Sequence, residues 1–315
     1  MLGGPKELEI YLKNESLQPG CSLKSRVAYA MVRQSLLLKK PIVESSSGNL
    51  ALGLGYWSDQ LGAPQPLCLI DDCCEQSMRD AMADAGCLIR VLELTADEHD
   101  RQTGVFKRID LARNYAERGY YWPNQYDCHQ WVQVHEATTG PEIWNDATDY
   151  SLVVAAVGTG ATISGIALSR PASSKSLIVA VEPIGSSIFG TQLGSYRIAG
   201  AGNPFTPKNY LGHLIDRELA VSDRDAFCAA GIMRAAGIRI GSSGATAVLG
   251  AARAATELRR GSHVALVVVA DDGWYEDFGP GFCLNFSDNG PRNSRRAPSP
   301  ASPLWQQIAT EISAT

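Results

Sequence analysis

The sequence predicts an α/β fold built on parallel sheets, and three observations lead to this prediction. Short apolar runs of strand type alternate with segments whose apolar residues recur at helical spacing, as they do in βαβ units. Loops rich in Gly and Ser follow strand-like runs and precede helical ones. The chain has 315 residues, which exceeds the usual size of one hydrophobic core, so we expect two lobes.

The first half of the chain supplies three of these alternations. Short apolar runs bounded by turn residues predict strands at residues 41–44, 66–70 and 87–94. Apolar residues at helical spacing predict helices over residues 27–38, 50–61, 75–85 and 103–118. Gly86 provides the turn before the third strand, and Gly119 closes the last of these helices.

The second half repeats the pattern around two further glycine loops, residues 158–162 and 241–244. Apolar runs predict strands at residues 152–157, 177–181 and 263–270. Helical spacing predicts helices near 142–147 and over 163–169, 223–236 and 245–259. After the last strand, Asp271-Asp272-Gly273 is a common turn, although acids at the carboxyl end of a strand often face a pocket.

An aromatic, proline-broken segment at residues 120–126 suits a hinge between two lobes. We therefore expect a smaller N-terminal α/β lobe at residues 22–126 and a larger C-terminal α/β lobe at residues 127–286, joined by residues 6–21. Residues 287–315 are rich in Ser, Asn, Pro and Arg without periodicity, which predicts a flexible tail.

Composition excludes several classes of function. The net charge of −5 and the pI near 5.6 argue against a nucleic-acid-binding surface, which needs a basic face. No run reaches the roughly 18 apolar residues of a membrane span, so we expect a cytoplasmic protein without membrane contact. The eight cysteines form no CxxC pair and no zinc-type spacing with His, so we expect no metal site.

Lys24 is the first candidate functional residue. Residues 17–26 form a glycine-turned loop that delivers it to the start of a helix. The positive end of the helix dipole opposes an ammonium there and favours a neutral amine or an imine. A lysine that binds an aldehyde covalently needs that state. The alternative is a solvated lysine without a chemical role.

Each of the other candidate residues has a functional interpretation and a purely structural one. Residues 158–162 have the features of a phosphate cup, with unobstructed N–H groups, two threonine hydroxyls and a helix N-terminus, or they form a tight turn. Either Ser242 or Ser243 meets a cofactor ring nitrogen, or both cap a helix. Asn49 and Gln125 have ordinary roles available as a helix N-cap and a turn residue.

The order of the motifs carries a resemblance that no single motif does. The Lys24 loop is followed by Ser-Ser-Gly-Asn (46–49), Asn-Gln-Tyr (124–126), Gly-Thr-Gly-Ala-Thr (158–162), Val-Glu-Pro (181–183) and Gly-Ser-Ser-Gly (241–244). This series resembles the pyridoxal-phosphate (PLP) enzymes of fold type II, the cysteine synthase and cystathionine β-synthase family. The resemblance runs from about residue 12 to residue 275 and implies two doubly wound α/β lobes with the cofactor in the cleft between them.

The resemblance also implies roles for individual residues. Lys24 is the imine lysine, Asn49 binds the ring hydroxyl, and Ser242 faces the ring nitrogen. A neutral serine there would leave the ring unprotonated and a weak electron sink. The cofactor phosphate is bound by Gly158, Thr159, Gly160, Ala161 and Thr162, and the substrate carboxylate by Ser46, Ser47, Gly48, Asn49 and Gln125.

Within the family, residues 44–50, 121–126 and 181–190 look most like synthases of N-(2-amino-2-carboxyethyl)-L-glutamate. Those enzymes join O-phospho-L-serine to L-glutamate through an aminoacrylate intermediate, on the way to 2,3-diaminopropionate for siderophores and peptide antibiotics. Leu50, in place of the threonine of ordinary cysteine synthases, agrees with this branch. Gly158 looks like cysteine synthase instead, so that activity is the alternative.

Several further expectations follow from this resemblance. Arg108 and Tyr126 are the candidates for binding a phosphate leaving group, and a surface position is the alternative for Arg108. The family's Gly-Asn-Thr-Pro-Leu segment is absent, so we expect the chain to lack a first strand. We expect small amino-acid substrates and a homodimer. A serine/threonine dehydratase and a non-catalytic binding protein are less favoured.

Overall fold

The computed structural model describes residues 7–95, 101–146, 148–258, 261–274 and 276. Its strands form two sheets, one of five strands in the order β1-β8-β5-β6-β7 and one of three in the order β2-β3-β4. Within the described residues every strand pairing in these sheets is parallel. The strands are β1 (Glu7–Asn14), β2 (Val43–Ser45), β3 (Leu67–Asp71), β4 (Leu88–Leu92), β5 (Leu152–Ala156), β6 (Leu177–Pro183), β7 (Arg217–Val221) and β8 (Ser262–Val269).

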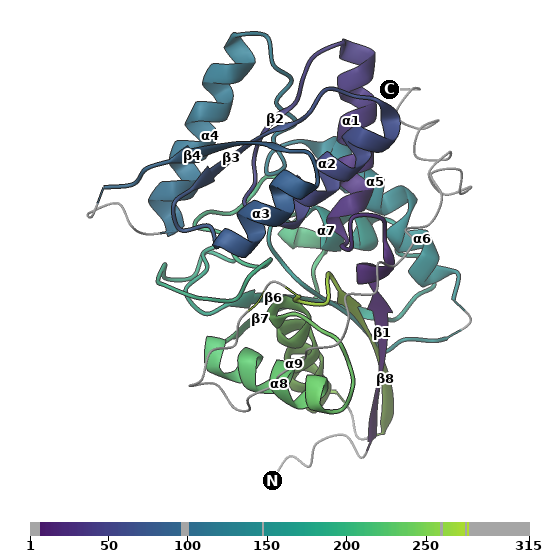
Figure 1. Ribbon diagram of the computed structural model, residues 1–315. Helices are drawn as coiled ribbons and strands as arrows, with labels where there is room; N and C mark the ends of the chain where they lie inside the picture. The colour runs from purple at the N-terminus through teal and green to yellow at the C-terminus, as the bar shows by residue number, and fades with distance from the viewer. Residues whose placement is uncertain (1–6, 96–100, 147, 259–260, 275, 277–315) are drawn as a thin grey trace.

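Helices connect most of these strands, as is usual for parallel pairing, whereas β6 and β7 are joined by a long segment that contains only a short 3₁₀ turn. The helices are α1 (Lys24–Leu38), α2 (Asn49–Leu61), α3 (Gln76–Asp84), α4 (Arg101–Glu117), α5 (His129–Ala137), α6 (Thr139–Trp144), α7 (Ala161–Leu168), α8 (Asp223–Ala235) and α9 (Ser242–Thr256), with short 3₁₀ turns η1 (Glu15–Leu17) and η3 (Gly212–Leu214). The predicted α/β fold with parallel sheets is confirmed. In Figure 1 the three-stranded sheet occupies the upper half of the view, and α8 and α9 lie together in the lower half, below β6 and β7 and to the left of β1 and β8.

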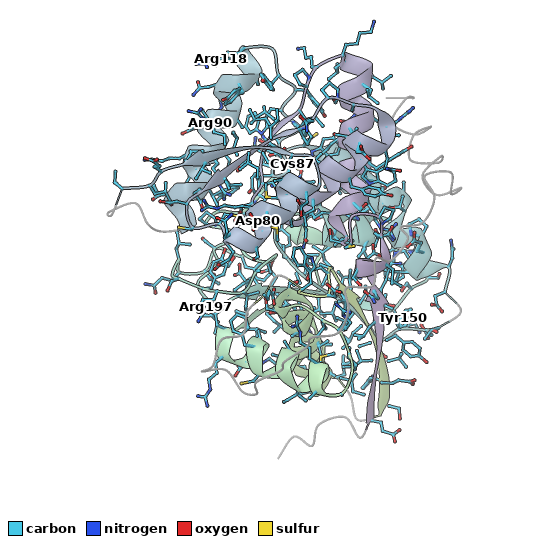
Figure 2. The ribbon with its side chains drawn as sticks, viewed as in Figure 1. Asp80, Cys87, Arg90, Arg118, Tyr150 and Arg197 are labelled. Carbon is cyan, nitrogen blue, oxygen red and sulfur yellow. The ribbon has the colours of Figure 1, made fainter. Side chains whose placement is uncertain are left out.

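Both sheets bury apolar side chains on both faces. In the small sheet, Cys68 and Ile70 pack with α2 and α3, and Val43 and Leu69 pack with α4 on the other face. Cys87, labelled in Figure 2, belongs to the first of these clusters. Residues of β5, β6 and β8 alternate in the same way between a cluster with α8 and α9 and a cluster with α7. This two-sided burial explains why these strands read as continuous apolar runs.

The segment before Lys24 differs from the expectation of a connector without a strand. Residues 7–14 form β1, which pairs with β8 from Glu7 opposite Ser262 to Asn14 opposite Val269. Leu8, Ile10 and Leu12 alternate with polar residues and pack against the core of the larger sheet. The physical reason is that period-2 alternation suits an edge strand with one buried face. The lobe boundaries at 22–126 and 127–286 stay a prediction.

Three other features were not predicted from the sequence, and one lies beyond what the structure describes. Helix α5 and edge strand β7 were missed, and α1, α7 and α9 begin two or three residues earlier than their apolar periodicity indicated. The tail expected at 287–315 lies outside the described residues. None of the helices in the described ranges combines the length and the apolar character needed to span a bilayer.

Candidate active site

The carboxyl ends of strands from both sheets meet around one cavity with a volume of ≈ 360 Å³. Residues that follow β2, β3, β5 and β8 form its wall, at the edge where open α/β sheets bind ligands. The predicted site residues that line it are Lys24, Ser46, Ser47, Gly48, Asn49, Arg108, Gln125, Tyr126, Gly158, Thr159, Gly160 and Thr162. Ala161 and Ser242 do not line it.

Three helices begin at this cavity, and their N-cap residues make no side-chain hydrogen bond. Helix α1 begins at Lys24, α2 follows Gly48 and α7 follows Gly160. The first N–H groups of a helix have no partner within it, and they add to the positive end of the helix dipole. Such helix ends favour anions. The cavity therefore offers separate places for a carboxylate and a phosphate.

Lys24 reaches the predicted phosphate cup from across the cavity. Its Nζ donates a hydrogen bond of 3.2 Å to Thr159 Oγ1, 135 positions further along the chain. Gly160 has a φ of +85°, and a Cβ on it would lie 2.6 Å from Cα of Tyr210, so this position requires glycine. Behind the cup, Thr162 Oγ1 is 3.2 Å from Nε2 of His135.

The predicted carboxylate loop is fixed from its own side of the cavity. Ser46 Oγ accepts a 3.1 Å bond from the backbone N–H of Ala51, and Gln125 Nε2 donates a 2.7 Å bond to the carbonyl of Ser45. Asn49 Nδ2 donates to Asp271 Oδ2 at 2.5 Å, which ties the start of α2 to the end of β8. The loop thus meets the larger sheet at Asp271.

Arg108 lies in the cavity wall, and the alternative of a surface position does not hold. Its residue exposure is 5%, and its Nε is 3.4 Å from Oδ2 of Asp71. Its Nη1 is buried and has no hydrogen-bond partner among the described residues. Tyr126 is buried beside the same cavity, and burial raises the pKa of its phenol, which stays a neutral donor.

Ala161 and Ser242 lie behind the cavity wall. The side chain of Ala161 is buried in the cluster of α1, α2 and α5, so only its backbone is available to a ligand. Ser242 Oγ donates a 2.8 Å bond to Glu276 Oε1 and accepts a 3.1 Å bond from the N–H of Ala199. Its neighbour Ser243 lines the cavity, and its Oγ is buried without a hydrogen-bond partner among the described residues.

Comparison with known proteins agrees with this geometry. The family model described as "Pyridoxal-phosphate dependent enzyme" matches residues 2–270. The chain belongs to the pyridoxal-phosphate dependent enzymes. A cysteine synthase of Buchnera aphidicola subsp. Schizaphis graminum is 32% identical over 259 residues, which cover 77% of this chain and 79% of the relative. A cysteine synthase of Staphylococcus aureus is 28% identical over 270 residues, covering 82% and 85%.

The fold of this pyridoxal-phosphate dependent enzyme also has solved counterparts. The O-acetylserine dependent cystathionine β-synthase from Helicobacter pylori superposes with a TM-score of 0.78 at 24% identity, covering 89% of this chain and 92% of that one. The predicted fold type II architecture is confirmed by this likeness. The chain is therefore a cysteine synthase-like enzyme of the β-replacement and lyase type that depends on PLP.

The cavity fits PLP on observations of this structure alone. Ser22 and Ser243 line the cavity, and their buried hydroxyls have no hydrogen-bond partner in the part of the chain that the structure describes, as expected where a polar ligand supplies one. Lys24 is the amine in the cavity wall, and the uncapped start of α7 adjoins it through Thr159. An aldehyde and a phosphate on one small molecule match this pair of groups.

Burial lowers the pKa of the Lys24 amine, which would bind the aldehyde. Desolvation lowers the pKa of Lys24 from 10.5 to about 8, and the carboxyl of Glu44 opposes this shift. Glu44 is fully buried, and desolvation raises its pKa from 4.5 to about 8 although it accepts hydrogen bonds from the N–H groups of Ser45 and Gln125. Burial thus moves the pKa of Lys24 toward the neutral amine, which is the direction that the sequence predicted.

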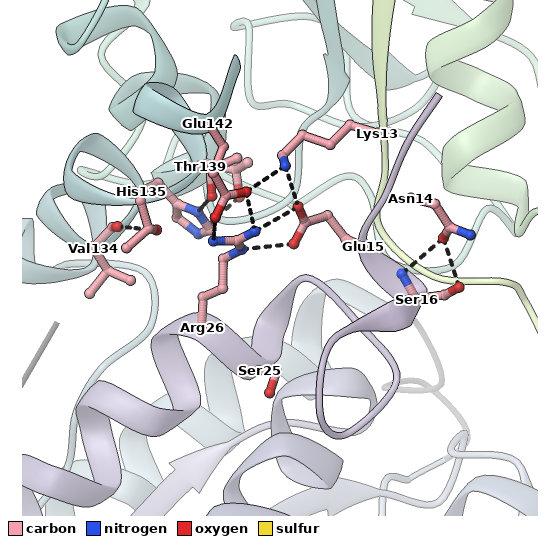
Figure 3. Close-up of polar contacts among 12 residues, drawn as sticks. Lys13, Asn14, Glu15, Ser16, Ser25, Arg26, Val134, His135, Thr139 and Glu142 are labelled. Carbon is pink, nitrogen blue, oxygen red and sulfur yellow. Dashed lines mark hydrogen bonds and ion pairs between the residues drawn. The ribbon is translucent and has the colours of Figure 1, made fainter. Parts of the chain in front are cut away.

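A buried ion cluster fixes the helix that begins at Lys24 (Figure 3). Arg26, which is fully buried, donates bonds of 2.7 and 2.9 Å to both carboxylate oxygens of Glu15. It donates two further bonds, of 2.8 and 2.7 Å, to Glu142 of α6. Lys13 lies 2.5 Å from Glu142 and 3.3 Å from Glu15. Two cations and two anions therefore join β1, η1, α1 and α6.

Sequence reasoning missed several residues of the site. Asp71, Asn203 and Gly200 line the cavity, and Asn203 Nδ2 donates a 2.7 Å bond to the carbonyl of Gly158. The only signal for Asp71 was its place at the end of a strand. Glu276, which binds Ser242 behind the cavity wall, gave no signal at all. No group of three or more His, Cys, Asp or Glu side chains suited to a metal ion occurs in the part of the chain that the structure describes.

Proposed function

We propose that this enzyme joins O-phospho-L-serine to L-glutamate, giving N-(2-amino-2-carboxyethyl)-L-glutamate and phosphate. The Cβ–O bond of phosphoserine breaks, and a Cβ–N bond to the amine of glutamate forms. The product would serve 2,3-diaminopropionate formation in siderophore or peptide-antibiotic biosynthesis. The observation that carries the proposal is the buried guanidinium of Arg108 in the cavity wall, whose Nη1 has no hydrogen-bond partner among the residues that the structure describes.

Arg108 is suited to bind a dianionic leaving group. Its Nη1 has no hydrogen-bond partner among the described residues, and a buried donor left unpaired costs free energy. Asp71 forms an ion pair with Arg108 on one side of the guanidinium, with 3.4 Å between Asp71 Oδ2 and Arg108 Nε. The side that carries Nη1 therefore stays available to a ligand. A guanidinium matches phosphate in both charge and geometry. The neutral hydroxyl of Tyr126 is a further donor beside it.

The remaining residues have roles in binding and in moving one proton. When bound, PLP supplies an aldehyde and a ring that stabilises negative charge at the α-carbon of an amino acid. Lys24 would hold the aldehyde, residues 158–162 the phosphate and Asn49 the ring hydroxyl. The ring nitrogen would face the start of α9, where Ser243 lines the cavity and Ser242, the residue expected from the resemblance, lies behind the wall. With a pKa of about 8, Lys24 Nζ is suited to remove the α-proton of the substrate near neutral pH.

The start of α2 would orient the substrate. Its N-cap, Gly48, leaves the first N–H groups of the helix without a side-chain partner, and a carboxylate is favoured there. Ser46, Ser47 and Gln125 line the same part of the cavity. A fixed carboxylate holds the α-carbon in one orientation toward Lys24, which is the main contribution the protein can make to proton removal.

Steady-state kinetics with two serine donors test the proposal. Arg108→Ala should raise KM for phosphoserine by about 10- to 100-fold and leave KM for acetylserine within about threefold, because only the former loses a charged hydrogen bond. Asp71→Asn, which frees Arg108 from its partner, should lower KM for phosphoserine. Arg113→Ala, an exposed arginine on the same helix, is the control. If Arg108→Ala raised KM for both donors equally, Arg108 would not be the residue that binds the phosphate leaving group.

Cysteine synthase activity is the second candidate. Relatives that are 28% and 32% identical are cysteine synthases, and Gly158 agrees with that group. Product analysis by mass spectrometry separates the two, with phosphoserine or acetylserine as donor and glutamate or sulfide as acceptor. If cysteine were the only product, the enzyme would be a cysteine synthase and the proposal of glutamate as acceptor would be wrong.

A homodimer is the assembly that the resemblance implies, and we propose it for this chain. Light scattering of the purified protein measures the mass directly. A mass of one chain at micromolar concentration would contradict it.

A further inference from the structure

An acid stands beside the arginine that is proposed to bind the phosphate leaving group. Within the described residues, the charged side chains that line the cavity are Lys24, Asp71, Glu75, Arg108 and Asp271. Asp71 ends β3, and its Oδ2 lies 3.4 Å from Nε of Arg108. A carboxylate at this distance repels a phosphate dianion that approaches the same guanidinium. Binding of the leaving group therefore does not explain why the cavity holds an acid here.

The position of the Asp71 carboxylate depends on a glycine of α4. Gly104 lies one turn before Arg108, and a Cβ on it would lie 2.5 Å from Oδ2 of Asp71. The carbonyl of Gly104 also accepts a 3.3 Å bond from Nε of Arg108. The Asp71 side chain is 9% exposed and accepts no hydrogen bond within the described residues. Its oxygens can therefore accept hydrogen bonds from a ligand in the cavity.

Arg108 presents the opposite charge next to this acid. Its Nη1 is buried and lacks a hydrogen-bond partner in the described part of the chain. A guanidinium matches a carboxylate as well as it matches a phosphate. The wall thus offers a hydrogen-bond acceptor of negative charge beside a donor of positive charge. An α-amino acid carries the complementary pair, an ammonium and a carboxylate separated by one carbon atom.

We propose that Asp71 and Arg108 bind the acceptor as a zwitterionic α-amino acid, with its ammonium on Asp71 and its carboxylate on Arg108. The inference rests on the proposed function and assigns a place to its second substrate. Arg108 serves the two substrates in turn, because the carboxylate of the acceptor takes the position that phosphate has left. The ammonium on Asp71 then lies next to that position, where the new bond forms.

A simpler account is that Asp71 only neutralises the buried charge of Arg108. A buried cation without a partner is costly, so this account also explains the ion pair. The two accounts differ in which substrate they affect. An acid with a structural role affects the donor and every acceptor alike. The proposed role affects an acceptor that has an ammonium and a carboxylate, and it does not affect sulfide, which has neither.

Steady-state kinetics of the PLP-loaded full chain, with acetylserine as donor, separate these accounts. Asp71→Asn should raise KM for L-glutamate by about 10- to 100-fold, the effect of one charged hydrogen bond, and leave KM for acetylserine and for sulfide within about threefold. Gly104→Ala, which displaces the carboxylate without removing its charge, should also raise KM for glutamate. Asp110→Asn, which changes an exposed acid on the same helix, should alter none of these values.

Inorganic phosphate gives a second measurement, which requires no variant to fold. Phosphate and the carboxylate of the acceptor would both use Nη1 of Arg108. With acetylserine as donor, phosphate should therefore inhibit the wild type competitively with respect to glutamate. Inhibition that saturating glutamate does not relieve would show that the acceptor does not use Arg108, and the proposal would be wrong.

Two further results overturn the proposal. One is a KM for glutamate that neither Asp71→Asn nor Gly104→Ala raises, or that rises together with KM for acetylserine to the same extent. The other is product analysis by mass spectrometry in which sulfide is the only acceptor. If the product contains an α-amino acid other than glutamate, only the proposed acceptor is wrong, and the same KM comparison with that amino acid decides whether Asp71 and Arg108 bind it.

Discussion

The buried pair of Arg26 and Glu15 offers a sharp test of how this fold positions Lys24, the proposed cofactor lysine. We expect Glu15→Gln to reduce the free energy of unfolding by about 3 kcal/mol, because removing one partner of a buried pair leaves an uncompensated charge. The side-chain exposures are 0% for Arg26 and 1% for Glu15, and two hydrogen bonds of 2.7 and 2.9 Å join them.

The magnitude lies at the low end of the range for such pairs because Glu142 still binds Arg26 through two hydrogen bonds. The charge of the cluster changes from zero to +1 in a site with little solvent. Urea denaturation followed by circular dichroism at pH 7 measures the change as a shift of the midpoint at constant slope. A double-mutant cycle with Arg26→Gln isolates the energy of the pair.

Asp110→Asn is the matched control, because Asp110 forms an ion pair with Arg113 at exposures of 67% and 58%. Exposed pairs of this kind contribute about 0.2–1 kcal/mol. If Glu15→Gln cost no more than this control, the claim that burial makes the Arg26 cluster important for α1 would be wrong. Weaker retention of PLP by Glu15→Gln should accompany the loss of stability, since α1 begins two residues before Arg26.

Two further predictions concern the cup and the buried acid near Lys24. Gly160→Ala should abolish tight PLP binding in fluorescence titrations, since a Cβ would lie 2.6 Å from Tyr210 Cα. It should also lower the free energy of unfolding by roughly 2 kcal/mol or more. The control Gly62→Ala, which has open space around it, should lower this free energy by only about 1 kcal/mol. The folded-state pKa of Glu44 is raised from 4.5 to about 8, so the stability that its protonation contributes is fully present below pH 4.5 and is lost as the pH rises to about 8. In Glu44→Gln the free energy of unfolding of the cofactor-free protein, measured by urea denaturation, should fall less between pH 4.5 and about pH 8 than in the wild type. If this dependence on pH were unchanged, the buried position of the Glu44 carboxyl would be contradicted.

Much of the site could be predicted because its residues belong to local motifs. Gly160 needs a left-handed backbone, the serine loop precedes a helix, and Lys24 begins another. These preferences depend on neighbours in the sequence, and the order of the motifs identifies the family. Edge strand β1 was readable in principle from the alternation of Leu8, Ile10 and Leu12, but its partner β8 lies at the other end of the chain.

The sequence by itself determined the class of fold and the cofactor, and it predicted Lys24 as the cofactor lysine, since periodicity, glycine positions and motif order are properties of the chain. Only the tertiary structure decided which polar groups meet: Arg108 with Asp71, Arg26 with Glu15, and Ser242 with Glu276. The physical reason is that burial and electrostatic interaction depend on distances between remote segments. No local pattern encodes these distances, and they set the pKa values on which the chemistry depends.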